Sequence, residues 1–165
     1  MRRIMLAAAC MLVGTCVVGS ASIKEEQIEV GGSSSLKFGK SLAEGGGTFY
    51  DVTAIAGYFW KKNIEFRAAI NYAKAGDADG NGGLVVGADY LWQSRSEWVP
   101  YAGGGLGISF GNGSDAIGLI HGGTRYFVNE NLSVNIEAKY GSTLSHIGDG
   151  LLEADVGLSY YFDHL

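Results

Sequence analysis

The fold is decided by the stretch Ile64-Glu65-Phe66-Arg67-Ala68-Ala69-Ile70-Asn71-Tyr72, in which apolar and polar side chains alternate. Its even-numbered positions are all apolar, whereas Glu65, Arg67 and Asn71 stand at odd-numbered positions. Successive side chains of a β-strand point to opposite faces, while a helix would scatter these residues around its circumference. The stretch therefore predicts a strand with one apolar face and one polar face.

The same period of two recurs along most of the chain, and after about residue 27 the apolar set falls on even numbers. We predict eight strands, at residues 27–40, 48–60, 64–73, 83–92, 98–110, 116–127, 132–140 and 151–162. Their connections alternate between Gly/Ser/Asp-rich loops and mostly tighter turns, and the strands reach the ~9–11 residues that cross a hydrocarbon layer. The predicted fold class is all-β, an eight-stranded antiparallel up-and-down transmembrane β-barrel.

The division into even- and odd-numbered positions, which we call parity, does not say which face points outward. A soluble lipocalin-like barrel with an apolar interior is therefore the alternative. Two observations favour a barrel that faces lipid. Fourteen of the nineteen aromatic residues are even-numbered, and most stand near strand ends, where interfacial girdles lie. The other face carries many charges, which suit a polar lumen better than a lipocalin pocket.

Ionisable side chains on the odd-numbered face are expected to meet inside the barrel. Acids and bases nearly balance there, and an unpaired charge is costly in a low dielectric, so we expect pairing across the lumen as a structural plug. A gated path for small ions is the alternative. The predicted network consists of Glu65, Arg67, Asp89, His121, Arg125, Glu137, Lys139, Glu153 and Asp155.

The N-terminus has the three-part layout of a secretory signal peptide. Arg2 and Arg3 precede a fifteen-residue apolar run at positions 4–18, and small residues follow up to Ala21. We predict a signal peptide at residues 1–21 and the barrel domain at residues 22–165. A retained membrane anchor is disfavoured because the run is shorter than the ~20 residues that span a bilayer.

Both cysteines, Cys10 and Cys16, lie in the predicted signal peptide, so the mature chain would have no disulfide and no thiolate metal site. Residues 13–16 resemble a lipobox, which leaves lipidation of Cys16 as an alternative. The mature chain would keep ten Lys/Arg against seventeen Asp/Glu. This acidic balance argues against nucleic acid as a partner.

The C-terminal sequence Asp155-Val156-Gly157-Leu158-Ser159-Tyr160-Tyr161-Phe162 resembles the signal by which the barrel-assembly machinery of the outer membrane recognises its clients, through Gly157, Tyr160 and Phe162. Residues 57–65 and 125–133 resemble each other and the strand–turn–strand units of OmpA/OmpX-like eight-stranded outer-membrane proteins, as does segment 99–107. The resemblance implies a bacterial outer-membrane location with periplasmic termini. It also implies outer-membrane lipid, lipopolysaccharide, and surface proteins or host ligands as partners.

Members of this family include membrane-anchoring barrels, adhesin-like surface proteins, weak pores and a few lipid-A-modifying enzymes. For this chain the resemblance implies a non-enzymatic structural or surface-interaction role, without a cofactor. A narrow porin-like channel for small solutes or ions is the alternative, and a lipid-A-modifying enzyme is the third hypothesis.

Two loops carry residues that invite a chemical interpretation. Asp77-Ala78-Asp79-Gly80-Asn81-Gly82 matches the first half of an EF-hand loop, but Ala88 stands where the bidentate Glu belongs, so we expect no metal site. The last loop contains serine, histidine and carboxylate side chains, from which a hydrolase or acyltransferase site could be built: Ser142, Ser145, His146 and Asp149. Ser145 and His146 are adjacent and would point to opposite faces of an extended chain, so we predict no catalytic residue among the four.

Overall fold

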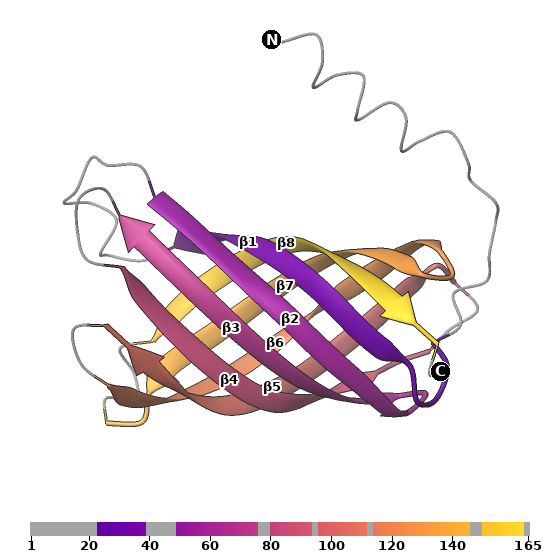
Figure 1. Cartoon of the computed structure of the whole chain (residues 1–165), viewed down its shortest axis with the longest axis horizontal. Helices are drawn as coiled ribbons and strands as arrows, with labels where there is room; N and C mark the ends of the chain where they lie inside the picture. Colours follow the sequence, from indigo (N-terminus) through magenta and orange to yellow (C-terminus); the bar gives the residue numbers. More distant parts are fainter. Residues whose placement is uncertain are drawn as a thin grey trace, which may run out of the picture.

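The chain forms one closed antiparallel barrel in the computed structural model, which describes residues 23–38, 49–75, 80–93, 96–111, 114–145 and 150–163. Each strand pairs with its neighbours in sequence, and the last strand closes on the first (Figure 1). The strands are β1 (Ile28–Phe38), β2 (Phe49–Lys61), β3 (Ile64–Ala75), β4 (Asn81–Leu91), β5 (Trp98–Phe110), β6 (Asp115–Asn129), β7 (Leu132–Thr143) and β8 (Leu151–Phe162). The predicted fold class is confirmed.

The predicted strands agree with the observed ones within three residues at each end that the structure describes. Residues 39–40 and 48, which the prediction assigned to strands, lie outside the described residues. The predicted signal peptide at 1–21, including Cys10 and Cys16, lies outside them as well. Within the described part, no helix is long and apolar enough to cross a membrane.

At one end of the barrel β2, β4 and β6 end and β3, β5 and β7 begin, next to the described N- and C-terminal residues, and we call this the turn end (Figure 1). At the opposite end, the loop end, β1, β3, β5 and β7 end and β2, β4, β6 and β8 begin. This alternation is the consequence of an up-and-down topology with an even number of strands.

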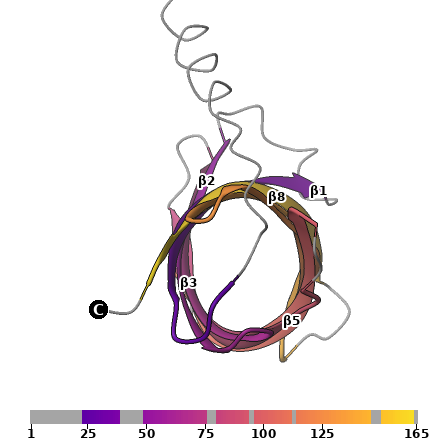
Figure 2. The ribbon, with the colours of Figure 1, turned by 90° about the vertical axis from the view of Figure 1, so that its right-hand side faces the viewer.

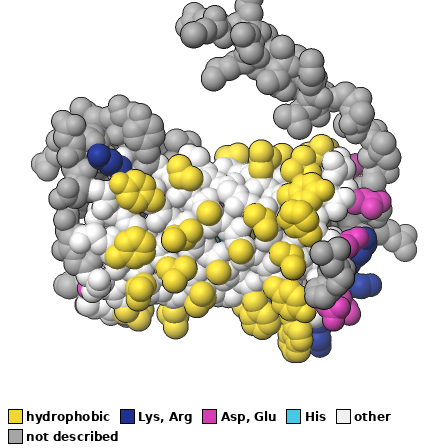
Figure 3. Space-filling model, viewed as in Figure 1, with side chains coloured by type: hydrophobic (Ala, Val, Ile, Leu, Met, Phe, Trp, Pro, Cys, Tyr) yellow, Lys and Arg dark blue, Asp and Glu magenta, His cyan; other side chains and the backbone are white. Residues whose placement is uncertain are grey.

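The outer surface of the barrel is apolar, and its interior is polar. All exposed large apolar side chains among the described residues have even numbers, and all buried polar or charged ones have odd numbers. Figure 3 shows one side of the barrel, with apolar side chains along the length of the wall and charged ones at its ends. A lipocalin-like barrel would have the opposite arrangement, so that alternative is wrong. A wall of this kind is stable when lipid surrounds it.

Aromatic side chains ring the turn end of the outer surface. Trp98 on β5 and Tyr126 on β6 form a ring pair with centroids 4.9 Å apart, and Tyr160 and Phe162, both on β8, form another with centroids 4.7 Å apart. Aromatic rings with one polar edge prefer the boundary between lipid and water. The girdle that the sequence predicted at strand ends is therefore present at this end.

The wall has one seam, between β1 and β2. β1 pairs with β8 along its whole length, from Ile28 to Phe38, but its pairing with β2 extends only from Ile28 to Ser33. β2 in turn stays paired with β3 up to Phe49. Figure 2 shows β1 and β2 apart from each other at the loop end. Within the described strands, the loop-end half of this seam therefore lacks the inter-strand hydrogen bonds that join β1 and β2 at the turn end.

Candidate functional site

The turn end of the lumen is filled by apolar side chains, which we call the apolar plug. The N-terminal segment 23–27 crosses the mouth of the barrel here (Figure 2), and the buried side chain of Ile23 joins the plug. Backbone hydrogen bonds hold the segment, because the Glu26 amide donates to the Phe59 carbonyl at 2.7 Å and the Phe59 amide donates to the Gln27 carbonyl at 2.9 Å. The plug consists of Ile23, Phe59, Leu91, Val99, Tyr101, Phe127 and Tyr161.

A polar clamp fixes the same segment to the end of β8. The Lys24 ammonium contacts one carboxylate oxygen of Asp163 at 2.9 Å, and the Gln27 amide donates to the other at 3.1 Å. The hydrogen bond and the charge of Lys24 lower the pKa of Asp163, and the same pair raises the pKa of Lys24. Glu26, with φ at 63°, makes the left-handed turn that leads the chain into β1. The clamp therefore joins the two termini of the barrel.

Arg125 on β6 is the centre of the charged layer above the plug. Its Nη2 lies 2.6 Å from Glu65 Oε2 on β3, and its Nη1 lies 2.9 Å from Glu29 Oε2 on β1. The guanidinium also lies over the Tyr101 ring, 4.8 Å from its centroid. Only 1% of the Arg125 side chain is exposed. One cation is thus shared by two buried carboxylates on the opposite wall.

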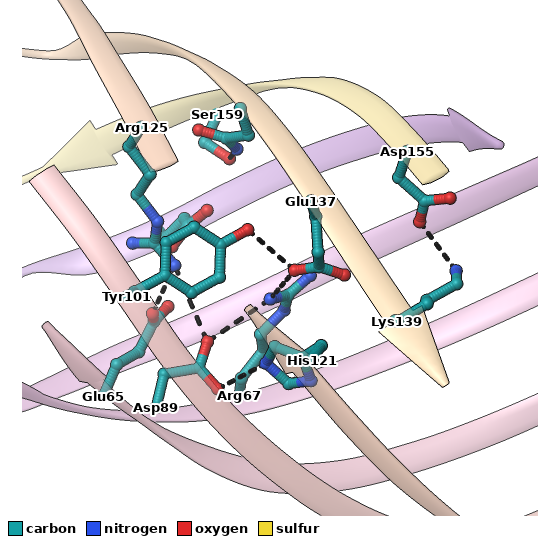
Figure 4. A network of polar contacts seen from close by, with 12 residues as sticks. Glu65, Arg67, Asp89, Tyr101, His121, Arg125, Glu137, Lys139, Asp155 and Ser159 are labelled. Carbon is teal, nitrogen blue, oxygen red and sulfur yellow. Dashed lines mark hydrogen bonds and ion pairs between the residues drawn. The ribbon is translucent and has the colours of Figure 1, made fainter. Parts of the chain in front are cut away.

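Asp89 on β4 extends this layer across the lumen (Figure 4). Arg67 Nη1 on β3 lies 3.3 Å from Asp89 and 2.7 Å from Glu137 on β7. His121 Nε2 lies 2.7 Å from Asp89, and the Tyr101 hydroxyl donates to Glu137 at 2.7 Å. The central charge cluster is the set of Glu29, Glu65, Arg67, Asp89, Tyr101, His121, Arg125 and Glu137.

Lys139 forms a separate group on the loop side of this cluster. Its Nζ lies 2.6 Å from Asp155 Oδ2 and 3.0 Å from Glu153 Oε2, both on β8. The structure thus brings the predicted network residues together in two groups, one around Arg67 and Arg125 and one around Lys139. Arg67 and Lys139 each contact two carboxylates, and Arg125 contacts two closely and Asp89 at 3.8 Å.

The described lumen is more acidic than the near balance that we expected from the sequence. Glu29 adds a buried carboxylate that the prediction did not include. The inward acids are Glu29, Asp51, Glu65, Asp89, Glu137, Glu153 and Asp155, against Arg67, Arg125 and Lys139 with His121 as a further base. The prediction left out Glu29, which its odd number also places inside, and the side chain of Lys37, which it counted among the inward bases, lies outside the described residues.

A cavity of about 580 Å³ occupies the loop-end half of the lumen. Arg67, His121 and Glu137 of the central charge cluster line its deep end. One part of its wall carries the Lys139 group, and the β3 to β6 part carries small and apolar residues. The latter include Ala69, Ala73, Gly83, Val85, Gly87, Gly105, Ile117, Gly118 and Leu119. The cavity therefore ends at the charged layer.

The other predicted residues lie away from this interior or outside the described residues. Tyr160 and Phe162 are outward-facing and about half exposed near the turn end, and Gly157 faces inward against Ser33 on β1. Ser142 lines the cavity, and Ser145 is exposed. Asp77 and Asp79 of the EF-hand-like loop, and His146 and Asp149 of the catalytic hypothesis, are not among the described residues. Among all residues that the structure describes, no cluster of three or more His, Cys, Asp or Glu side chains could hold a metal ion.

Sequence reasoning missed the apolar plug and Glu29. The signal for the plug was present, because five aromatic residues break the even-numbered rule. Four of these five, Phe59, Tyr101, Phe127 and Tyr161, are in the plug. Aromatic residues on the lumen face of strands, near one end only, could therefore have indicated a closed end.

No protein-family model matches the chain, and no curated protein matches it. Solved structures of eight-stranded barrels do. The N-terminal β-barrel domain of Pseudomonas aeruginosa OprF has a TM-score of 0.66 at 16% identity, over 84% of this chain and 98% of that one. A de novo designed transmembrane β-barrel has a TM-score of 0.62 at 18% identity, over 86% of this chain and 99% of that one. Neisserial surface protein A has a TM-score of 0.60 at 13% identity, over 84% of this chain and 96% of that one. These likenesses establish the fold.

Proposed function

We propose that this chain is a non-enzymatic β-barrel of the bacterial outer membrane that does not conduct, with a structural or surface-interaction (adhesin-like) role. The observation that carries the proposal is the closure of the turn-end half of the lumen. There the apolar plug and the central charge cluster lie one behind the other, with Phe59, Arg125 and Tyr161 at most 1% exposed. Ions would have to break buried ion pairs and then cross an apolar layer.

The termini are periplasmic in this proposal, and the loop end faces the outside. Short turns with both termini at one end support it, because outer-membrane barrels have short periplasmic turns and longer extracellular loops. The apolar wall fits lipid, and the outer loops would meet lipopolysaccharide, neighbouring surface proteins or host ligands. Tyr160 and Phe162, on the outer face of β8, remain accessible to the assembly machinery in the way that the C-terminal signal requires.

Conductance tests the closed lumen. The purified chain is reconstituted into lipid vesicles, its insertion is checked by the heat-shifted mobility of folded barrels on gels, and potassium flux is recorded. We expect flux no higher than in protein-free vesicles, and an ionophore added at the end shows that the vesicles can report it. A steady flux that scales with inserted protein would instead support the narrow channel, with cation preference because the lumen is acidic.

Cysteine labelling in cells tests the orientation independently. Ser145→Cys places a thiol at the loop end and Lys62→Cys places one in a turn, both at exposed positions. A maleimide that does not cross the outer membrane should label Ser145→Cys in intact cells and Lys62→Cys only after permeabilisation. The reverse pattern would overturn the proposed orientation.

A further inference from the structure

The loop-end cavity has no role in the closed-barrel proposal, yet it has the properties of a small-molecule site. Its volume of about 580 Å³ falls in the range of roughly 300–1,000 Å³ that is usual for ligand pockets. Pockets of this kind are mostly apolar, with a few polar groups that fix the orientation of the ligand. The lining here has that composition, with small and apolar residues mostly on β3 to β6 and charged ones mostly on β7 and β8, besides Arg67 and Lys74 on β3 and His121 on β6.

Two buried polar atoms belong to residues that line this cavity. Asp155 Oδ1 and His121 Nδ1 have no hydrogen-bond partner among the described residues. The side chains are 4% and 6% exposed, so they are held in place and shielded from bulk water. The other oxygen of Asp155 accepts from Lys139, and Nε2 of His121 faces Asp89. A buried acceptor without a donor is costly. Both atoms have almost no accessible surface, so a small rotation of the side chain is needed to bring either one to a donor group bound in the cavity.

The charge of the deep end favours a cationic donor. Arg67 is shared by Asp89 and Glu137, and Lys139 is shared by Glu153 and Asp155. Among the described side chains that face into the lumen, seven carboxylates stand against three permanent cations, Arg67, Arg125 and Lys139, so the interior has an excess of negative charge. Because lipid surrounds the wall, such an excess is poorly screened, and a ligand cation would be attracted into the cavity.

We propose that the loop-end cavity binds a small amphipathic organic cation, an amine whose ammonium group donates to Asp155 and whose apolar body lies against the β3 to β6 wall. Ala69, Val85 and Leu119 supply apolar surface on that wall. In the neutral imidazole with its proton on Nε2, the His121 Nδ1 atom is a further acceptor for the same class of ligand. The blind deep end makes this a binding site and not a passage.

Binding of 2-phenylethylamine tests the proposal. The folded protein in detergent micelles is titrated with this amine, with its neutral analogue 2-phenylethanol and with the anionic 3-phenylpropanoate, and the methyl resonances of Ala69, Val85 and Leu119 are followed by NMR. Micelles without protein give the partition background. We expect saturable shifts with the amine and at least tenfold weaker responses with the other two compounds.

Variants test separately the roles of the Asp155 charge and of the cavity volume. Asp155→Asn should weaken the amine at least tenfold, whereas Asp163→Asn, the same change at the opposite end and outside the lumen, should leave its affinity unaltered. Ala73→Trp should abolish binding by filling the cavity without changing its charge. This variant keeps the test valid if Asp155→Asn fails to show the heat-shifted mobility of the folded barrel.

Equal, saturable binding of the alcohol and the amine would overturn the assignment of a cation site, and so would unchanged amine affinity in Asp155→Asn. Lack of saturation with all three probes would overturn it as well. None of these outcomes depends on conductance, so failure of the closed-barrel proposal and failure of this one can be told apart.

Discussion

Replacement of Arg125 by Met should destabilise the barrel more than removal of any other single charge in the lumen. The guanidinium lies 2.6 Å from Glu65 and 2.9 Å from Glu29, and all three side chains are at most 1% exposed. At an effective dielectric of about 20, opposite charges ~4 Å apart attract by roughly 4 kcal/mol. Desolvation offsets part of this attraction, and removing one partner of a buried pair typically costs about 3–5 kcal/mol. We expect a loss in that range for Arg125→Met.

Urea unfolding in lipid vesicles measures this loss. Trp60, Trp92 and Trp98 lie on the outer surface near the turn end, so their fluorescence should shift to the red as unfolding moves them from lipid to water. The free energy of unfolding is extrapolated linearly to zero denaturant. Lys139→Met serves as the comparison, because Lys139 is 13% exposed and lines the open cavity. We expect a smaller loss there, roughly 1–3 kcal/mol, because the cavity gives this group partial access to water.

Neutralising the two carboxylates should restore most of the stability. The triple variant with Arg125→Met, Glu29→Gln and Glu65→Gln removes Arg125 together with the two carboxylates closest to it, and replacement of all members of a buried ion triad is often close to neutral. If Arg125→Met lost no more than Lys139→Met, the layer would be hydrated and weakly coupled. If the triple variant were as unstable as the single one, Arg125 would act by filling space and not by compensating charge.

Three further predictions concern the wall, the clamp and the seam. Ile136→Arg, at the middle of β7 on the lipid face, should cost about 2–4 kcal/mol of unfolding free energy, and Ala69→Arg, at mid-height in the cavity, should cost less; equal losses in urea unfolding would contradict the assignment of faces. The Lys24–Asp163 clamp should hold above the lowered pKa of Asp163 and be lost as acid protonates this carboxylate. NMR should therefore show residues 23–27 become more mobile only when the pH falls through this lowered pKa, below the ordinary range of an aspartate, and Asp163→Asn should give the same mobility at neutral pH. Amide exchange should be faster along the β1–β2 seam beyond Ser33 than along β3–β4, and uniform protection would show that the seam is closed in lipid.

The sequence predicted the wall of the barrel well because a strand offers only two directions for a side chain. Once Ile64 and Phe66 were assigned to lipid, Glu65 and Arg67 had to point inward, and a shift by one residue would have put every charge into the membrane. The same parity constrains the whole chain from β1 to β8. This is why the strand positions and both faces could be read without any knowledge of pairing.

The contents of the lumen could not be predicted to the same degree. Parity places a side chain inside but does not say how far along the axis or against which strand it lies. Arg67 reaches Glu137 from the opposite wall, and Arg125 reaches Glu29, contacts that depend on strand tilt and on the register around the closed barrel. The folding of Ile23 into the turn end depends on a segment before the first strand, where no alternation exists to be read.

The empty space in the loop-end half does not by itself indicate a ligand. A Cβ built on Gly105 would lie 2.6 Å from the carbonyl oxygen of Val86, and one on Gly87 would lie 2.9 Å from the Cα atom of Gly105. Close approach of β4 and β5 therefore excludes larger residues there whether or not anything binds, and the cavity follows in part from the curvature of the wall. The carboxylates have no such explanation, because Glu153 and Asp155 share Lys139 and Asp155 keeps a buried oxygen without a hydrogen-bond donor among the described residues. Charge, not volume, is thus the property that distinguishes a binding site from a packing consequence, and for that reason the amine and its neutral analogue of similar size form the decisive pair of probes.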